Sequence, residues 1–414
     1  MSGQVERGAR IRPRNRKQLI VAAAGARFLR FGYTGTAMTA IAADLDVTST
    51  ALYRHFPNKQ ALLAAVVTEA TRSVAAAAEE ARGDGVDALL DVLTRQALLR
   101  RGHPALWRRE ARQLDAAGQQ GTGRRLLVLR DAVRDELCAA RDLGEADAVF
   151  LAECVLSLLG SVSYHQVTPP GGRLEALLRE LAGRAATAPV PVAVSGAVGV
   201  PFAAPQAPEP SADRREQLVR EATRLFAARG YADVGIEDVA AAAGIAGPSV
   251  YHHFSGKADL LAEIIDRSAR AIRRYTDAAL GDGSSPADSL RLLLRSYAGF
   301  ALGHRAGIAV SVTEVIHLPR AESAAYRAVQ REGILRWVRL LCAARPGLDE
   351  DEARVTVQAV VMLVNDAVRR PPPADPGERA ALVDRLAGVG LRVLLPDLAS
   401  PEVALLQDVL PQET

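Results

Sequence analysis

The chain has 414 residues, of which 49% are hydrophobic and 24% are charged, with a formal net charge of +3 at pH 7. This length exceeds what one hydrophobic core supports and suits two or more folded domains. Its three cysteines lack Cys-x-x-Cys spacing, which argues against a disulfide framework or a zinc knuckle and favours a reducing cytoplasm. No apolar segment follows the basic N-terminus, so we expect no secretory signal.

One sequence pattern occurs twice, 198 residues apart and without gaps. Residues 16–63 and 214–261 share 14 of 48 aligned positions. The shared positions include Phe28, Gly32, Tyr33, Tyr53, His55, Phe56 and Lys59, which recur as Phe226, Gly230, Tyr231, Tyr251, His253, Phe254 and Lys257. A repeat of this length predicts two copies of a unit of about 200 residues.

Residues 1–15 form a basic N-terminal arm. Arg12 and Arg14 belong to its run of arginines, and flexible basic arms enter minor grooves or follow the nucleic-acid backbone. We therefore expect both arginines to contact DNA. The alternative is a disordered tail that only keeps the chain soluble.

We call each copy of the repeated pattern a head. The first head, residues 16–63, is predicted to contain three helices and the start of a fourth. An apolar stripe at helical spacing predicts a helix over 17–31, and Gly32 is expected to end it. Thr39 and Thr48 suit the N-caps of the second and third helices, the third reaching Phe56. A fourth helix is predicted from residues 57–59 toward residue 80. Strand-like alternation is absent, so the fold class is all-α.

The rest of the chain repeats this organisation. A helical regulatory domain is predicted over 64–185, followed by a Pro/Ala/Val-rich linker over 186–212. Residues 185–208 carry no charge, but five prolines exclude a membrane-spanning helix there, and we expect no membrane partner. The second head covers 213–261, a second regulatory domain 262–395 and a C-terminal tail 396–414.

The third helix of each head carries the side chains suited to reading a major groove. In the first head Arg54 can pair bidentately with guanine, while hydroxyls and a phenol suit phosphates or thymine methyls. Lys59 adds a charge at the start of the next helix. The DNA-contact candidates are Thr39, Thr48, Ser49, Thr50, Tyr53, Arg54, His55 and Lys59, and in the second head Ser249, Tyr251, His252, His253 and Lys257.

Several of these residues have a plainer interpretation. Tyr53 and Tyr251 more often pack and touch a phosphate than read a base. His55 and His253 more often bridge helix ends or a phosphate than bind a metal, and no metal site is predicted because no second ligand lies at helical spacing from His55. The phenylalanines of the repeat are expected to be core residues.

The two heads differ in charge and in the residues that read DNA. Residues 1–62 hold ten Arg or Lys against three acids, whereas 211–261 hold six against seven. Because phosphate neutralisation supplies much of protein–DNA affinity, the first head is expected to dominate binding to double-stranded DNA. Because the residues that would contact the bases differ between the two heads, we expect an operator with two different half-sites.

The heads resemble the DNA-binding domain of the TetR family of bacterial transcriptional regulators. The resemblance rests on Thr39, Ile41, Ala42, Val47 and the run of residues 52–63. The second head departs from the pattern at Glu237, in the place of Thr39, and at residues 246–248. The resemblance implies two TetR-like units in one chain, each with a helical ligand-binding and dimerisation domain, paired as an intramolecular pseudo-dimer. Separate homodimers through each copy remain an alternative.

The resemblance also implies a repressor that a small hydrophobic effector, of lipid or acyl-CoA type, releases from DNA. Polar groups among apolar helices favour the second copy as the pocket. The candidates are Tyr297, Phe300, His317, Trp337 and Asn365, and for any single one of them a role in the core is favoured over a role in ligand binding. Alternatives are an activator, or a regulator whose second unit only senses or pairs. No catalytic constellation repeats between the copies, so we expect neither an enzyme nor a cofactor.

Overall fold

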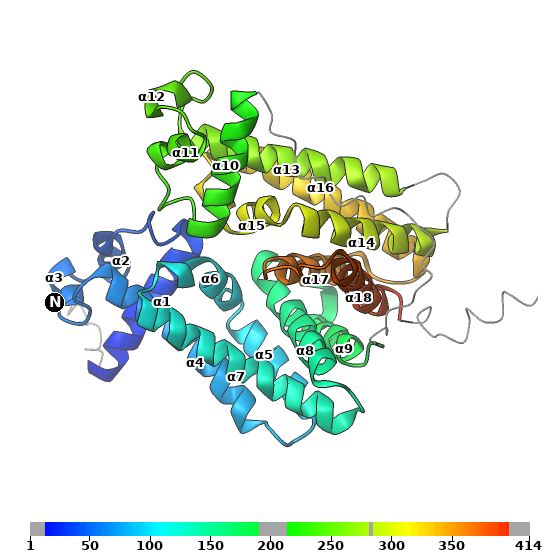
Figure 1. Ribbon diagram of the computed structural model, residues 1–414. Coiled ribbons are helices and arrows are strands. Elements are labelled where there is room, and N and C mark those ends of the chain that lie inside the picture. The colour runs from blue at the N-terminus through cyan, green and yellow to red at the C-terminus, as the bar shows by residue number, and fades with distance from the viewer. Residues whose placement is uncertain (1–12, 190–212, 281–284, 397–414) are drawn as a thin grey trace, which may run out of the picture. The chain divides into compact units, whose positions relative to one another are not determined.

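The computed structural model describes residues 13–189, 213–280 and 285–396, and all regular structure within these ranges is helical (Figure 1). The all-α prediction is confirmed. The predicted contact of Arg12, most of the predicted linker and nearly all of the C-terminal tail lie outside the described residues. The chain divides into two compact units, one of residues 1–76 with 102–127 and one of residues 77–101 with 128–414.

The first unit is the first head with three further helical segments. It comprises α1 (Pro13–Phe31), α2 (Met38–Asp44), α3 (Ser49–Tyr53), the start of α4 (Lys59–Glu80), α6 (His103–Glu110), η1 (Ala111–Gln113) and the start of α7 (Ala116–Ala140). Phe28, Ile41 and Leu52 are fully buried in its core, and Leu106 of α6 joins them there. The core of the first head therefore extends into the sixth helix.

Helix ends in the first head follow the sequence in part. Gly32 ends α1 as predicted, with φ of 74° and its N–H donating to the Phe28 carbonyl at 2.9 Å. The first helix begins at Pro13 rather than at residue 17, because proline suits a first helical turn. The prediction that Thr39 caps α2 is wrong: Ala37 is the N-cap, without a side-chain bond, and burial of Met38 sets the start. The third helix ends at Tyr53 rather than Phe56.

The second unit begins with the regulatory helices of the first copy. These are the end of α4, α5 (Val86–Leu99), the rest of α7, α8 (Glu145–Gly160), η2 (Ser161–Tyr164), η3 (Pro170–Gly172) and α9 (Leu174–Ala186). Glu136 of α7 accepts the backbone N–H groups of Gly83 and Gly85 and so holds the turn between α4 and α5.

The same unit contains the whole second copy. Its head is α10 (Arg214–Arg229), α11 (Ile236–Ala242), α12 (Gly247–Val250) and the start of α13 (Lys257–Ala279). Its regulatory helices are α14 (Pro286–Gly303), α15 (Arg305–Thr313), η4 (Val315–His317), α16 (Arg320–Ala344), α17 (Glu350–Val368) and α18 (Pro376–Leu394). Phe226, Phe254 and Val239 centre the core of the head, which Val310 of α15 joins.

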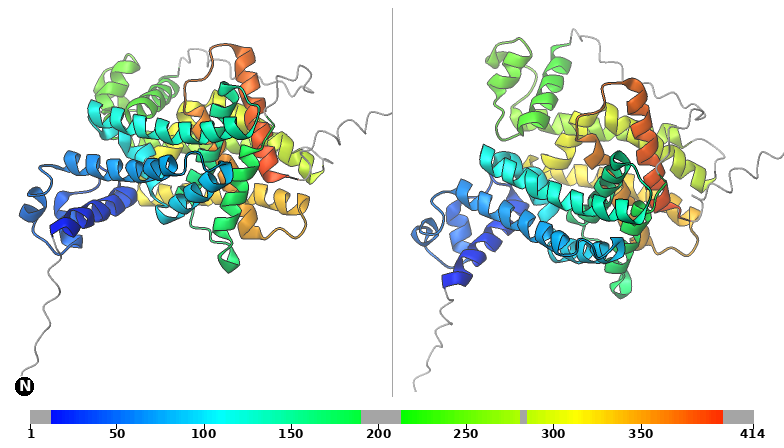
Figure 2. Two further views of the ribbon diagram at one scale, coloured as in Figure 1. Left: turned by 90° about the horizontal axis from the view of Figure 1, so that it is seen from below. Right: turned by 60° about the horizontal axis from the view of Figure 1, so that its bottom comes forward.

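Within the second unit, helices from the two copies pack on one another. α8 lies against α17, and α9 lies against α18 (Figures 1 and 2). Leu158 and Val155 of α8 and Val360 and Leu363 of α17 are at most 1% exposed. Helices 59–80 and 145–164 are long and apolar enough to cross a bilayer, but here α8 is a buried core helix of this four-helix layer.

Candidate nucleic-acid interface

The turn between the second and third helices of each head requires a left-handed residue. Asp46 occupies this position in the first head with φ of 51°, and Gly244 occupies it in the second with φ of 66°. Glycine adopts this conformation without strain, whereas other residues except Asn and Asp rarely do. The same backbone bond closes both turns, from the Val47 N–H to the Ala42 carbonyl at 3.1 Å and from the Ile245 N–H to the Ala240 carbonyl at 3.0 Å.

The third helix of the first head buries one face and exposes the other. Leu52 is fully buried, and the Thr48 hydroxyl caps the helix by accepting the Ala51 N–H at 3.3 Å. Thr50, Tyr53 and Arg54 lie on the exposed side with Thr48, Tyr53 being 50% exposed. Ser49 and His55 are half-buried, and Thr39 is exposed on α2. The exposed side chains therefore form a surface that a DNA groove can approach.

Arg54 presents an exposed guanidinium at the end of α3. Its side chain makes no ion pair with another residue of the described ranges, in contrast to Arg27, which pairs with Asp44. An unpaired, exposed guanidinium retains all its donors for a base edge or a phosphate. Contact between Arg54 and guanine stays a prediction. Arg14 lies in the first turn of α1, where only the backbone is described.

The reading helix of the second head is shorter and differently capped. α12 begins at Gly247 and Pro248, and its N-cap Ala246 offers no side-chain bond. Val250 is buried, whereas Tyr251 is 58% exposed and His252 is exposed beside it. Ser249 and His253 are half-buried. Both exposed faces therefore carry a tyrosine, and the second presents an imidazole where the first presents hydroxyls and an arginine.

Lys59 and Lys257 have a structural task that the sequence did not reveal. The Lys59 Nζ donates to the backbone carbonyls of Tyr33 at 2.8 Å and Thr36 at 3.0 Å, and lies 4.3 Å from the Tyr33 ring centre. Lys257 donates to the Ala232 carbonyl at 3.3 Å and lies 4.2 Å from the Tyr231 ring centre. Desolvation lowers the pKa of both amines. Each lysine therefore holds the loop after the first helix of its head, and its contact with a phosphate stays a prediction.

Cations of the second head are mostly paired with acids. Arg224 lies 2.9 Å from Glu221, Arg215 lies 3.2 Å from Glu263, and Arg229 lies 3.3 Å from Asp238. The exposed Glu237 adds a negative charge near the start of α12, because its Cγ lies 3.8 Å from where a Cβ on Gly247 would be. Phosphates therefore meet less positive charge at this head than at the first, in agreement with the residue counts.

A buried glutamate joins each head to its own regulatory helix, and the sequence analysis missed both residues. The Glu110 carboxylate, at the end of α6, accepts the Tyr33 N–H at 3.3 Å and pairs with Arg109 at 2.6 Å. Burial raises the pKa of Glu110, while Arg109 acts in the opposite direction. Glu314, after α15, accepts the Tyr231 N–H at 3.2 Å. The two glutamates are 204 residues apart, so a search at the 198-residue repeat could not align them.

The predicted ligand residues of the second copy fall into two places. The Tyr297 hydroxyl donates to the Asn365 amide oxygen at 2.7 Å, and its ring packs edge-on to Trp337 with centroids 6.0 Å apart. Phe300, also on α14, stacks on His304 at 4.3 Å. His317 lies elsewhere: it stacks on Tyr231 of the second head at 5.1 Å, beside Glu314. His317 therefore belongs to the joint between head and regulatory helices.

Two helix-turn-helix heads, each attached to its own helical domain, define a transcriptional regulator of the helix-turn-helix class. The model of the tetR family of bacterial regulatory proteins matches residues 20–66 and 218–264. The HTH-type transcriptional repressor KstR2 of Rhodococcus jostii (strain RHA1) is 30% identical over 196 residues, covering 45% of this chain and 92% of that protein. The chain belongs to the TetR family and carries two of its DNA-binding domains.

Other relatives share only one unit with the chain. The HTH-type transcriptional activator FasR of Mycolicibacterium smegmatis (strain ATCC 700084 / mc(2)155) is 26% identical over 160 residues, covering 39% of this chain and 73% of FasR. The solved structure of the ketosteroid transcriptional regulator KstR2 of Mycobacterium tuberculosis has a TM-score of 0.38 and 22% identity, covering 44% of this chain and 94% of that one. The two matches to the family model and the likeness to the repressor KstR2 make this chain a DNA-binding transcriptional regulator.

Proposed function

We propose that a single chain binds an operator of two unlike half-sites, with its two copies paired as an intramolecular pseudo-dimer. The packing of α8 on α17 and of α9 on α18 carries this proposal, because it joins the regulatory helices of one copy to those of the other. These faces are apolar and buried, as in an obligate interface. The alternative of two separate homodimers needs the same faces for other chains.

The two heads contribute unequally to affinity in this proposal. Arg54 is exposed and unpaired, whereas the arginines of the second head are mostly held by acids. Counterion release scales with the phosphates that are neutralised, so the first head sets most of the salt dependence. The second head supplies register and half-site choice through Tyr251 and His252.

A small hydrophobic effector binding in the second regulatory domain completes the proposal. Tyr297, Trp337 and Asn365 combine aromatic surface with one buried polar pair, the mix that orients an apolar ligand. FasR is named an activator and KstR2 a repressor, so these relatives do not decide the sign of regulation. We infer a repressor because a ligand that moves the helices spoils the fit of two heads to two grooves. We assign the protein to the cytoplasm as a repressor without catalytic activity.

The test is a titration of the upstream intergenic DNA at two salt concentrations with wild type, Arg54→Ala and His252→Ala. Arg72→Ala is the matched control, because Arg72 is exposed on α4 and, among the described residues, pairs with Glu69 of its own helix alone. We expect one chain per operator, a loss of about 1–3 kcal/mol for Arg54→Ala and a smaller loss for His252→Ala. Two chains per operator would contradict the pseudo-dimer. An unchanged affinity for His252→Ala would leave the second copy as a sensor or pairing module.

A further inference from the structure

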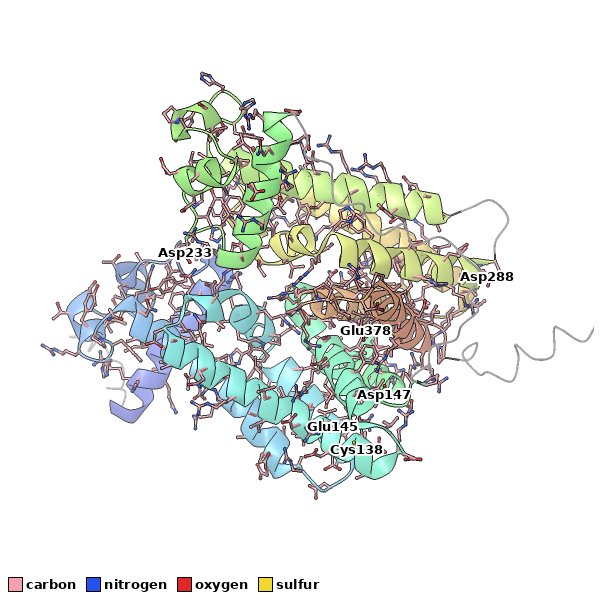
Figure 3. All side chains as sticks on the ribbon, viewed as in Figure 1. Cys138, Glu145, Asp147, Asp233, Asp288 and Glu378 are labelled. Atoms are coloured by element: carbon pink, nitrogen blue, oxygen red, sulfur yellow. The ribbon has the colours of Figure 1, made fainter. Side chains whose placement is uncertain are left out.

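Two ion pairs between the copies join an acid of α8 to an arginine of the second copy. Asp147 of α8 lies 2.7 Å from Arg385 of α18, whose guanidinium also covers the Phe150 ring at 4.2 Å. Glu153 of α8 pairs with Arg370, which follows α17. In both pairs the acid comes from the first copy and the arginine from the second. Figure 3 shows Asp147 at the start of α8.

A common register shows which residues of the two copies are equivalent. All nine buried positions of α8 recur as buried positions of α17 exactly 205 residues later, as with Val155 and Val360. The same offset relates Leu181 of α9 to Leu386 of α18. At this offset Asp147 corresponds to Glu352, Glu153 to Gln358, His165 to Arg370, and Glu180 to Arg385.

This register shows what a pair of identical copies would bring together. In a pair of first copies Asp147 would face Glu180, and Glu153 would face His165. Burial and Arg101 lower the pKa of His165 to about 4, so its ring offers no positive charge to Glu153 at neutral pH. In a pair of second copies Arg370 would face the uncharged Gln358. Both arrangements lose the pair that Glu153 makes with Arg370.

Among the described residues, the positions equivalent to Glu153 and Arg370 in the opposite copies carry no ion pair. His165 and Gln358 stand at the positions related to Arg370 and Glu153, and the His165 Nε2 and Gln358 Oε1 atoms are buried without a hydrogen-bond partner in the described structure. One further ion pair between the copies does not distinguish a first copy from a second as the partner of the first. Arg173 lies 2.7 Å from Glu180 of its own copy and 3.1 Å from Glu352 of the second copy. Arg173 would hold the acids together in a pair of first copies too, so the discriminating positions are those of Glu153 and Arg370.

We propose that charge directs pairing between the copies: the acidic face of the first copy, Asp147 and Glu153, accepts only the arginine face of the second, Arg370 and Arg385. This inference rests on the intramolecular pairing proposed above. Apolar burial holds the faces together without choosing a partner, whereas a wrong pairing leaves Glu153 or Arg370 at the interface without an opposite charge. The partner that fits the first copy is therefore a second copy, from its own chain or from another, because the second copy brings Arg370 to Glu153.

The test reverses one face at a time in the full chain. Variant A carries Asp147→Arg with Glu153→Arg, and variant B carries Arg370→Glu with Arg385→Glu. A third variant combines all four changes. The control carries Arg291→Glu with Arg354→Glu, since the ion pairs of these arginines within the described ranges stay inside their own helices. The thermal unfolding of each protein is followed by circular dichroism, and its molecular mass is measured by light scattering. Variants A and B are also refolded together from urea.

We expect A and B to melt below both the wild type and the control, and the four-fold variant to recover the wild-type melting temperature as one chain of 44.0 kDa. The refolded mixture of A and B should contain a complex of twice that mass, because each face finds its complement only on the other chain. The proposal stands only if both the four-fold variant and the mixture recover. Recovery in neither, or in one alone, overturns it.

These readouts contain no DNA, so they are independent of the operator titration. Two wild-type chains on one operator would contradict the proposal that a single chain binds it. If the four-fold variant and the mixture both recover in that case, the charge-directed pairing still stands.

Discussion

Replacing Glu314 by alanine should uncouple the second head from its regulatory helices. The carboxylate is fully buried and accepts two bonds, from the Tyr231 N–H at 3.2 Å and from the Thr313 hydroxyl at 2.7 Å. A hydrogen bond to a charged group contributes about 1.5–3 kcal/mol, so the two together contribute roughly 3–6 kcal/mol. Removing the acid also removes part of its burial cost. We expect a net loss of about 2–4 kcal/mol in the stability of the second unit.

The assay is urea unfolding followed by the fluorescence of Trp337, in a Trp107→Phe background that leaves one tryptophan. Hydrogen exchange at the Tyr231 amide reports the loop directly and should become faster. Glu314→Gln keeps an acceptor of the same shape and should lose less than Glu314→Ala. Glu322→Ala on the exposed side of α16 is the control. A loss below about 0.5 kcal/mol for Glu314→Ala, the range of ordinary surface substitutions, would refute the reasoning.

Four further substitutions test single positions. Asp46→Gly should stabilise the first head by about 0.5–1 kcal/mol and Gly244→Asp should destabilise the second, as melting temperatures will show, because both positions have positive φ. Lys59→Met should destabilise the first head by about 1–3 kcal/mol while leaving the salt slope of DNA binding unchanged; a slope lower by about 1 would instead indicate a phosphate contact. The raised pKa of Glu110 means that its contribution to stability is complete below pH 4.5 and is lost as pH rises through the raised value. Glu110→Gln should remove this slope from a plot of melting temperature against pH, and an unchanged slope would assign it to another group.

Residues that recur at the 198-residue offset were sufficient to predict the two heads. Phe28 and Phe226 are buried, and Gly32 and Gly230 have positive φ, because short-range periodicity and turn chemistry determine these positions. Thr39 was misassigned as a cap, since a buried residue one position earlier sets the start of α2. Local pattern is informative about helices and weaker about their first residue.

Contacts between distant segments could not be predicted in this way. Lys59 carries the same charge whether it touches a phosphate or the Tyr33 carbonyl, and only the folded loop distinguishes the two. Asp147 and Arg385 are 238 residues apart, and no spacing rule relates them. His317 was grouped with Tyr297 because both interrupt apolar helices, yet it packs on the second head. Such pairings depend on tertiary structure, which one sequence does not contain.

The duplicated joint between head and regulatory helix indicates how each head can follow its own domain. In each copy a lysine of the fourth helix and a buried glutamate of the regulatory helices hold the same loop, and the second copy adds the stack of His317 on Tyr231. A movement of α15 must either carry this loop along or break the bond that Glu314 accepts from the Tyr231 N–H, since the Thr313 bond lies at the end of α15 itself. Breaking the Tyr231 bond costs about 1.5–3 kcal/mol, comparable with the 1–3 kcal/mol typical of allosteric coupling. We therefore expect a movement of α15 to carry the loop with it.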